Sequence, residues 1–588
     1  MTTMSVEDFL WLLLAGAVPL LLPSIDDGVW DWEAWVQLGT SVGSLFFYPN
    51  RKNKNSPTKD EMGVTMGIVV IPVLLQVLAY NHSCGSANNR QRQRQTQMQH
   101  CWICCWATYA KMATLLVIPG SNRTLSTIAL CIILAVLLLD PSIERTTAGL
   151  FVITWCMLLP RIVKINCAAK SFTPGELKVV CLLLLIAFAE YARTMSAALL
   201  LASHKNYDGD DDDNDNDPKK TISSLWPIVA LSGSVSCCVC AYLSSNVRGI
   251  VSWGWRLSLN VVGPPWFVAV SLHVLHLATS AHYHNSNMFS PMIAIQWLID
   301  FLMEKENGHE RFWGLLYWIV VLVAASYPTH ALLLLAKAGP STTTNTKTNT
   351  NEKEKYHKHK PPSVVVTRKW FHLVAVFLFG PVTWQFPQLM SLSYAIAACI
   401  LVVLEVMRGD DTPLLQAFYA AFSDERKHEG VGDGDGQSTM IVSHLFLVVG
   451  CAVPLWMSQV LAASSNTNGD TLQLQPSSLL LLGEFGVVCV GIGDAMGAVV
   501  GTKWGKHKWG KNQRTLEGSL AMWLSMVVAT IVIGSCSGSN WRECGAFLGA
   551  TVLTTILEAF TVQLDNLVLP MFGSCVAVVL LLLEAAAN

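Results

Sequence analysis

The sequence predicts an all-α, polytopic integral membrane protein. Of its 588 residues, 52% are hydrophobic and only 14% are charged, whereas soluble globular proteins carry about 25% charged residues. Long apolar runs separated by short polar segments continue to the last residues. The longer runs approach the roughly 20 residues that a membrane-spanning helix requires. These observations indicate a chain that is solvated mainly by lipid.

Taken in order, the apolar runs predict about 14 to 17 membrane helices. The first run follows Glu7 and Asp8 and has no basic segment before it, so we expect a membrane or interfacial helix there rather than a cleaved signal peptide. The predicted helices are 9–22, 62–80, 102–118, 125–139, 147–164, 177–202, 225–245, 265–283, 312–337, 370–386, 389–407, 440–462, 478–501, 519–535, 544–562 and 566–585.

A low-complexity segment divides the predicted helices into two regions. Residues 341–360 are rich in Thr and Asn and then in Lys, His and Glu, a composition that cannot bury a core and is typical of disorder. We expect an N-terminal multi-helix region over 1–340 and a functional region over 361–588, where nearly every loop carries a compact charged motif. The net charge of −2 argues against nucleic acid as a partner.

Basic residues predict the orientation of the second region. The positive-inside rule places the segment before Trp370 in the cytoplasm, because it holds six basic residues. They are Lys353, Lys355, Lys358, Lys360, Arg368 and Lys369. Alternation of the helices then places 408–439 and 502–518 on the same side. A second basic loop, 503–514, therefore falls in the cytoplasm without having been used to set the orientation.

The densest motif extends from Gly491 to Ser519. Asp494 borders a row of glycines at every fourth position, which on a helix forms a stripe without side chains. Such a stripe allows close approach of either another helix or a ligand. A basic loop follows, and a carboxylate beside a row of cations is what a metal-bound polyphosphate requires. The glycines are Gly493, Gly497, Gly501 and Gly505. The cations are Lys503, Lys506, Lys508, Lys511 and Arg514, and the loop holds one acid, Glu517.

Further charged motifs lie at predicted membrane boundaries. Arg368-Lys-Trp-Phe-His372 enters a helix and is either an interfacial anchor or functional, since polar residues inside a membrane are usually paired or functional. Glu405 with Arg408, Asp424-Glu425-Arg426 and His444 follow.

The last motif holds two acids. Glu558, Thr561 and Asp565 have spacings that place them on one face of a single helix. Two acids at a membrane boundary require pairing, hydration or a metal ion.

These motifs together resemble the dolichol kinase family, which is related to phytol kinases and other CTP-dependent lipid kinases. The most specific segments are Gly493-Asp494-Ala-Met and Thr515-Leu-Glu517-Gly-Ser519, and the other motifs follow the family's order over about 360–588. One departure is visible, because Arg514 stands where the family commonly has Lys. Arg keeps the charge but binds phosphate as a planar fork instead of a point charge.

The resemblance implies transfer of the γ-phosphoryl group of CTP to dolichol. The product, dolichyl phosphate, would serve protein glycosylation at the endoplasmic reticulum membrane, with the active site facing the cytoplasm. Alternatives are a CTP-dependent kinase of phytol, farnesol or diacylglycerol, a membrane cytidylyltransferase, or a polytopic transporter that uses Glu190, Arg193 or Asp300.

For this reaction we expect Mg²⁺ or another divalent cation at Asp494, with Asp565 or Glu558 as a second carboxylate. Candidates for the base at the acceptor hydroxyl are Asp494, Asp424 and His444. The expected catalytic residues are thus Asp494, Asp565, Glu558, Asp424 and His444. The expected CTP contacts are Gly493, Gly497, Gly501, Lys503, Lys506, Lys508, Lys511, Arg514, Thr515, Glu517 and Gly518.

Overall fold

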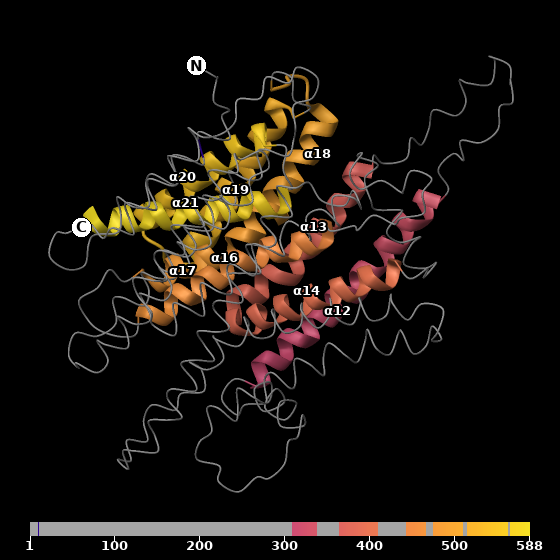
Figure 1. Ribbon diagram of the computed structural model, residues 1–588, viewed down its shortest axis with the longest axis horizontal. Helices are drawn as coiled ribbons and strands as arrows, with labels where there is room; N and C mark the ends of the chain where they lie inside the picture. Colours follow the sequence, from indigo (N-terminus) through magenta and orange to yellow (C-terminus); the bar gives the residue numbers. More distant parts are fainter. Residues whose placement is uncertain are drawn as a thin grey trace, which may run out of the picture.

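The computed structural model describes Leu10 and residues 308–337, 364–409, 443–465, 474–509, 514–561 and 565–587. All elements in these ranges are helices, which lie side by side in one bundle (Figure 1). They are α12 (Gly308–Lys337), α13 (Val364–Gln385), α14 (Pro387–Gly409), α16 (Ser443–Ser465), α17 (Pro476–Gly486), the π-helical segment η2 (Val487–Asp494), α18 (Ala495–Trp504), α19 (Leu516–Ser537), α20 (Trp541–Phe560) and α21 (Asp565–Ala587).

The helix positions predicted for the second region are confirmed, with boundaries that differ by a few residues. The predicted helix 478–501 corresponds to one apolar run from Pro476 to Trp504. Its middle is η2, where the backbone turn widens to a π-helix. Such segments inside α-helices are frequent at functional sites. The helices predicted before residue 308, the boundary 341–360 and the motif at Asp424 lie outside the described residues.

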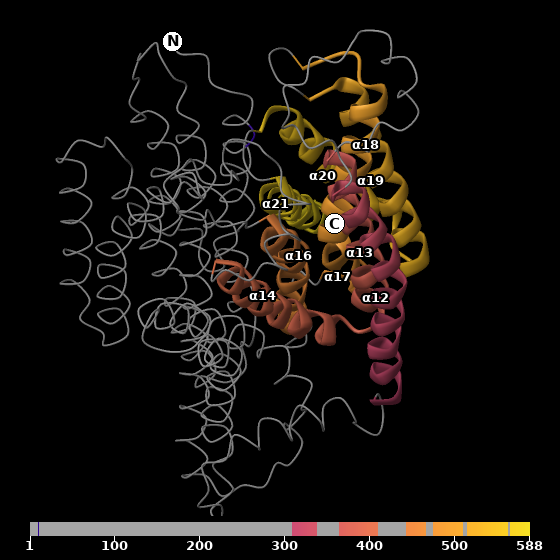
Figure 2. The ribbon, with the colours of Figure 1, turned by 90° about the vertical axis from the view of Figure 1, so that its right-hand side faces the viewer.

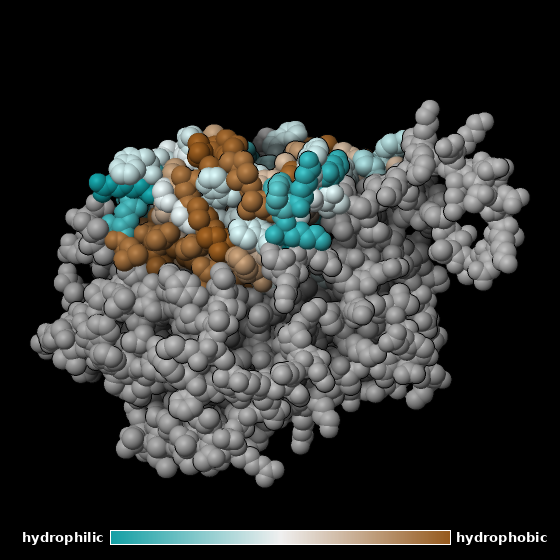
Figure 3. Space-filling model, turned by 90° about the horizontal axis from the view of Figure 1, so that it is seen from above, coloured by the Kyte–Doolittle hydropathy of each residue, from teal (hydrophilic) through white to brown (hydrophobic). Residues whose placement is uncertain are grey.

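In the part of the chain that the structure describes, five helical runs are long and apolar enough to cross a membrane: 311–331, 476–504, 516–537, 541–560 and 565–584. Large apolar side chains on the outer face of α19 are exposed, among them Leu520, Val528 and Val532. In the face shown in Figure 3, hydrophobic side chains fill the area between two hydrophilic patches. An apolar surface between polar ends is what a lipid-embedded bundle requires. The prediction of a polytopic membrane protein is confirmed.

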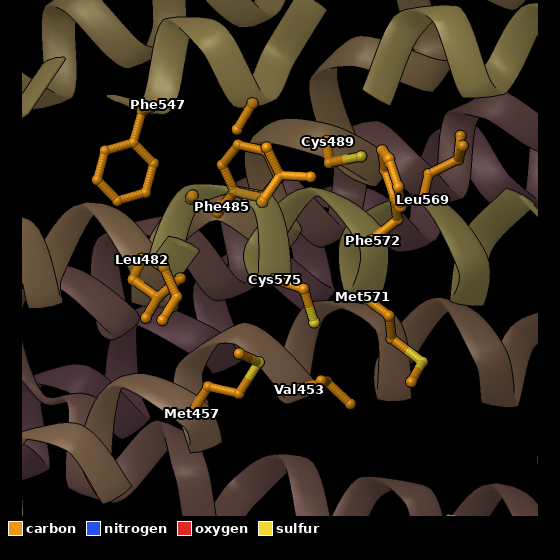
Figure 4. Close-up of a cluster of buried hydrophobic side chains, with 14 of the residues drawn as sticks. Val453, Met457, Leu482, Phe485, Cys489, Phe547, Leu569, Met571, Phe572 and Cys575 are labelled. Carbon is orange, nitrogen blue, oxygen red and sulfur yellow. The ribbon is translucent and has the colours of Figure 1, made fainter. Parts of the chain in front are cut away.

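The centre of the bundle is α21, which packs against α16, α17, α20 and η2 and lies between α16 and α20 in Figure 2. Its side chains Phe572 and Cys575 are buried in one core cluster with Phe485 of α17 and Phe547 of α20 (Figure 4). Because α21 is buried almost throughout, its first residues are held firmly at one end of the bundle.

Two prolines and a glycine bring α16 and α21 into close contact. Pro570 has no N–H for the carbonyl of Asn566, and Pro454 has none for the carbonyl of Gly450. A Cβ added at Gly450 would lie 1.9 Å from the carbonyl oxygen of Asn566. Only glycine therefore fits at this crossing, which fixes the position of Asn566.

We predict that Gly450→Ala destabilises the protein by about 1–3 kcal/mol, because the added methyl group must push the two helices apart. Gly545→Ala is the matched control, since a Cβ there would meet no atom within 4 Å. Thermal unfolding of both variants in detergent measures the difference. An equal melting temperature for the two variants would contradict the close crossing.

Candidate functional site

The candidate site centres on Asp494, the last residue of η2. Its carboxylate is buried and receives a hydrogen bond from the ammonium group of Lys369 on α13. The same carboxylate oxygen lies 3.2 Å from Nε2 of His372. Lys369 and His372 are three residues apart on α13, so they lie on one helical face. The entry motif of α13 is therefore not only an interfacial anchor, since two of its side chains contact Asp494.

His372 links Asp494 to the start of α21. Its Nε2 is also 3.3 Å from Oδ1 of Asn566, whose side-chain amide donates to the carbonyl of Ser443 at the start of α16. Two acceptor oxygens face Nε2, so this nitrogen carries a proton. His372 thus connects η2 and the start of α21, two segments that both lie far from it in the chain.

His444, a predicted candidate base, lies beside this network. Its ring meets Phe371 edge to face, with 5.7 Å between ring centroids. His444 follows Ser443, whose carbonyl accepts the hydrogen bond from Asn566, at the start of α16.

The glycine stripe is filled by α19. A Cβ at Gly493 would meet the side chain of Met526, and one at Gly497 would lie 3.2 Å from the carbonyl oxygen of Gly518. A Cβ at Gly501 would meet the hydroxyl of Thr515 at 2.9 Å. Of the two uses that the spacing allows, the structure shows helix packing for these three positions. The packing brings the start of α19 directly against α18.

The described ends of the connection between α18 and α19, 505–509 and 514–515, pair with each other. Lys508 and Thr515 form an antiparallel bridge, and the chain at 505–509 leaves the upper end of the bundle in Figure 2. Thr515 caps α19 by accepting a hydrogen bond from the N–H of Gly518. The Glu517 carboxylate accepts hydrogen bonds from the backbone N–H of His507, at 3.2 Å, and lies 2.7 Å from the ring nitrogen Nδ1 of His507. These contacts tie the connection to the first turn of α19.

Arg514 joins this connection to α20 and α21. Its guanidinium group donates to Glu558 and lies 3.4 Å from Oδ2 of Asp565. Ser519 also donates to Glu558, at 3.1 Å. The guanidinium therefore offsets the negative charge of two carboxylates, Glu558 in the last turn of α20 and Asp565 at the start of α21.

The expectation that Glu558, Thr561 and Asp565 share one face of a single helix is wrong. Helix α20 ends at Phe560, Thr561 is its extended C-terminal cap (φ −68°, ψ 143°), and Asp565 begins α21. The extended backbone at Thr561 ends the helical periodicity on which the spacing depended. The two acids come together through Arg514 instead.

The remaining predicted residues fall into two groups. Lys503, Lys506 and Lys508 are exposed around the connection, where Lys503 lies 5.9 Å from the ring centroid of Trp504. Lys511 and Asp424 lie outside the described residues. The exposed lysines provide a positive surface at the end of the bundle that holds Arg514.

Asp494 fits a metal ion that arrives with a nucleotide. Within the described ranges, no group of three or more His, Cys, Asp or Glu residues is placed to hold a metal ion. Mg²⁺ is usually held by one or two carboxylates together with substrate phosphates, so it needs no such group. The buried Asp494 carboxylate is one suitable ligand.

Sequence reasoning placed neither Lys369 nor Asn566 among the site residues. The role of Lys369 could have been inferred from Asp494, because burying its charged carboxylate costs free energy unless a cation lies close by. Lys369, one helical turn before the intramembrane His372, was a candidate for that partner. Nothing in the spacing of residues indicated Asn566, because its position depends on the crossing of α16 and α21.

Comparison with known proteins identifies relatives of one kind. The chain is 30% identical over 213 residues to the dolichol kinase sec59 of Schizosaccharomyces pombe, which covers 35% of this chain and 37% of that protein. It is 32% identical over 219 residues to the dolichol kinase EVAN of Arabidopsis thaliana, covering 35% and 34%. The human dolichol kinase is 26% identical over 282 residues, covering 47% and 46%.

The matched part of the chain thus spans about a third to a half of the length of these curated relatives. No family model and no solved structure matches the chain. The resemblance that the motifs predict is confirmed by these relatives: the chain is related to the dolichol kinases.

Proposed function

We propose that this protein is a dolichol kinase, which transfers the γ-phosphoryl group of CTP to the terminal hydroxyl of dolichol. The observation that carries the proposal is the contact of Lys369 and His372 with the buried carboxylate of Asp494, with His372 held on its other side by Asn566. Asp494 lies in the segment that most resembles the dolichol kinase nucleotide site. The dolichol kinases found among the relatives support the same reaction.

Phosphoryl transfer requires mainly positioning and stabilisation of charge. Asp494 would hold the divalent cation, and Asp565 or Glu558 would be the second carboxylate if Arg514 turns towards the nucleotide. A bound Mg²⁺ would neutralise part of the charge that develops on the phosphate oxygens. The exposed Lys503, Lys506 and Lys508, together with Lys511, would attract the triphosphate to the end of the bundle.

Thr515, Glu517 and Gly518 would position the nucleotide through the connection between α18 and α19. Because Glu517 fixes the backbone at His507, it would hold the basic segment in one conformation. Gly493 in η2 and Gly497 and Gly501 in α18 would act by keeping these two segments close to α19, so that Asp494 and Thr515 stay in register. His444, Asp424 or Asp494 would accept the proton of the dolichol hydroxyl.

We place the protein in the endoplasmic reticulum membrane with Asp494 and the basic connection on the cytoplasmic side. The positive-inside rule supports this orientation. A cysteine introduced at Lys508, which is exposed, should react with a membrane-impermeant maleimide in sealed microsomes without detergent. Labelling of that cysteine only after detergent is added would reverse the orientation.

The function is tested with purified protein in lipid vesicles and γ-labelled CTP or ATP. We expect labelled dolichyl phosphate with CTP and much less with ATP. Phytol, farnesol and diacylglycerol are the competing acceptors, and preferential labelling of one of them would change the substrate. The absence of labelled lipid with every pair would exclude the kinase and favour a transporter.

A further inference from the structure

The carboxylate of Asp494 has two neighbours on α13 with different chemistry. Lys369 brings a full positive charge on a flexible stem. His372 is buried and is held on its other side by Asn566. Nδ1 of His372 meets no hydrogen-bond partner among the described residues.

A buried carboxylate without a nearby cation is strongly unfavourable. Among the described contacts of Asp494, only Lys369 provides a permanent positive charge. A divalent cation bound at Asp494 would bring a larger charge to the same oxygens. Two cations at one buried carboxylate repel each other, so the lysine and the metal ion cannot both keep their best position.

We propose that Lys369 is an exchangeable counter-ion of Asp494, which a divalent cation displaces when it binds there. This inference rests on the proposed function, because it takes Asp494 as a metal ligand. Lys369 is a positioning residue in this scheme: it keeps the carboxylate charged and buried until the metal ion arrives.

The position of Lys369 suits an exchangeable group better than that of His372. The Lys369 side chain is 14% exposed, against 7% for His372, and it lies one turn nearer the start of α13. A lysine stem can withdraw its ammonium group towards water while its methylenes stay packed. His372 is held by Asn566, so it stays in place and preserves the orientation of Asp494.

The proposal predicts that a substitution beside the metal ligand increases the affinity for the metal ion. Loss of Lys369 should strengthen metal binding, because the ion no longer has to displace the ammonium group. If Lys369 helped to hold the metal ion or were only structural, its loss would weaken binding or leave it unchanged.

The test measures Mn²⁺ binding by electron paramagnetic resonance on purified full-length protein without nucleotide. We expect Lys369→Met to bind Mn²⁺ about tenfold more tightly than the wild type or better, and Lys369→Arg to bind it weakly. The double variant Lys369→Met, Asp494→Asn should lose this tighter Mn²⁺ binding. Arg542→Met removes an exposed charge that lies in none of the site motifs and controls for long-range electrostatics, with an expected change of about twofold or less.

Thermal unfolding gives a second readout in case Lys369→Met folds poorly. Without metal the variant should melt below the wild type, and Mn²⁺ should raise its melting temperature more than that of the wild type. Lys369→Gln should behave in the same way. Mn²⁺ affinity of Lys369→Met equal to or below that of the wild type overturns the proposal, as does failure of both neutral variants to fold even with Mn²⁺.

The exchange of Lys369 for a metal ion and the kinase function can be refuted independently of each other. Wild-type protein that phosphorylates dolichol while Lys369→Met shows no gain in Mn²⁺ affinity would refute the exchange and leave the kinase intact. Wild-type protein that labels no lipid would refute the kinase, whereas the Mn²⁺ affinities would still report on the exchange.

Discussion

Asp494→Asn is expected to reduce phosphoryl transfer from CTP by about a hundredfold or more, the largest effect of any single substitution. Asparagine has nearly the same shape, so it should keep the packing of η2 against α13 and α19. It loses the negative charge that a divalent cation requires. The rate of lipid labelling from γ-labelled CTP, measured at saturating dolichol, gives the result directly.

The carboxamide also changes the balance of charge around α13. Lys369 would lose its partner, but its side chain reaches the edge of the buried region and can withdraw towards water. The stability of Asp494→Asn should therefore fall less than its activity. A melting temperature measured beside the activity separates the two effects.

Glu484→Gln provides the matched control for Asp494→Asn. Glu484 is a second buried acid in the same apolar run from Pro476 to Trp504, and its Oε1 has no hydrogen-bond partner among the described residues. The exchange of carboxylate for amide is the same, but this acid lies in none of the site motifs. Glu484→Gln should keep nearly full activity. Equal losses in the two variants would show that any buried acid of this helix matters, and the metal-ligand role of Asp494 would fail.

Most of the fold in the described part of the chain could be predicted from apolar run length. The predicted helices 519–535, 544–562 and 566–585 correspond to α19, α20 and α21 because a lipid-embedded segment must satisfy its own backbone. The π-helical segment at Val487–Asp494 could not be predicted in this way. It leaves composition and length unchanged and alters only the hydrogen-bond register of the backbone.

The candidate site was predictable as a set of motifs but not as a set of contacts. Asp494 and Arg514 stand out because charge is expensive near a membrane. Their partners depend on how helices cross, and the crossing of α16 with α21 at Gly450 is set by packing. The spacing of Glu558 and Asp565 led to the wrong helical face because helix α20 ends between them.

The second large effect is expected at Arg514. Arg514→Ala should raise the apparent KM for CTP by about tenfold or more, because it removes a phosphate-binding fork and leaves two carboxylates unbalanced. Glu558 is only 13% exposed, so its charge is poorly screened without the guanidinium group. Arg514→Lys should recover only part of the loss, since a point charge cannot reach both Glu558 and Asp565 in parallel.

Glu558→Gln separates the two roles of Arg514. If Arg514 acts only by fastening the connection to α20, Glu558→Gln should raise the KM for CTP as Arg514→Ala does, and the double variant should be no worse than either. If Arg514 also contacts phosphate, as we expect, Arg514→Ala should raise the KM well beyond the value for Glu558→Gln. The losses of unfolding free energy in the two single variants should not add up to the loss in the double variant. The difference, a coupling energy, should be about 0.5–3 kcal/mol. Additive melting temperatures would contradict the contact between Arg514 and Glu558, and an unchanged KM in Arg514→Ala would remove Arg514 from the nucleotide site.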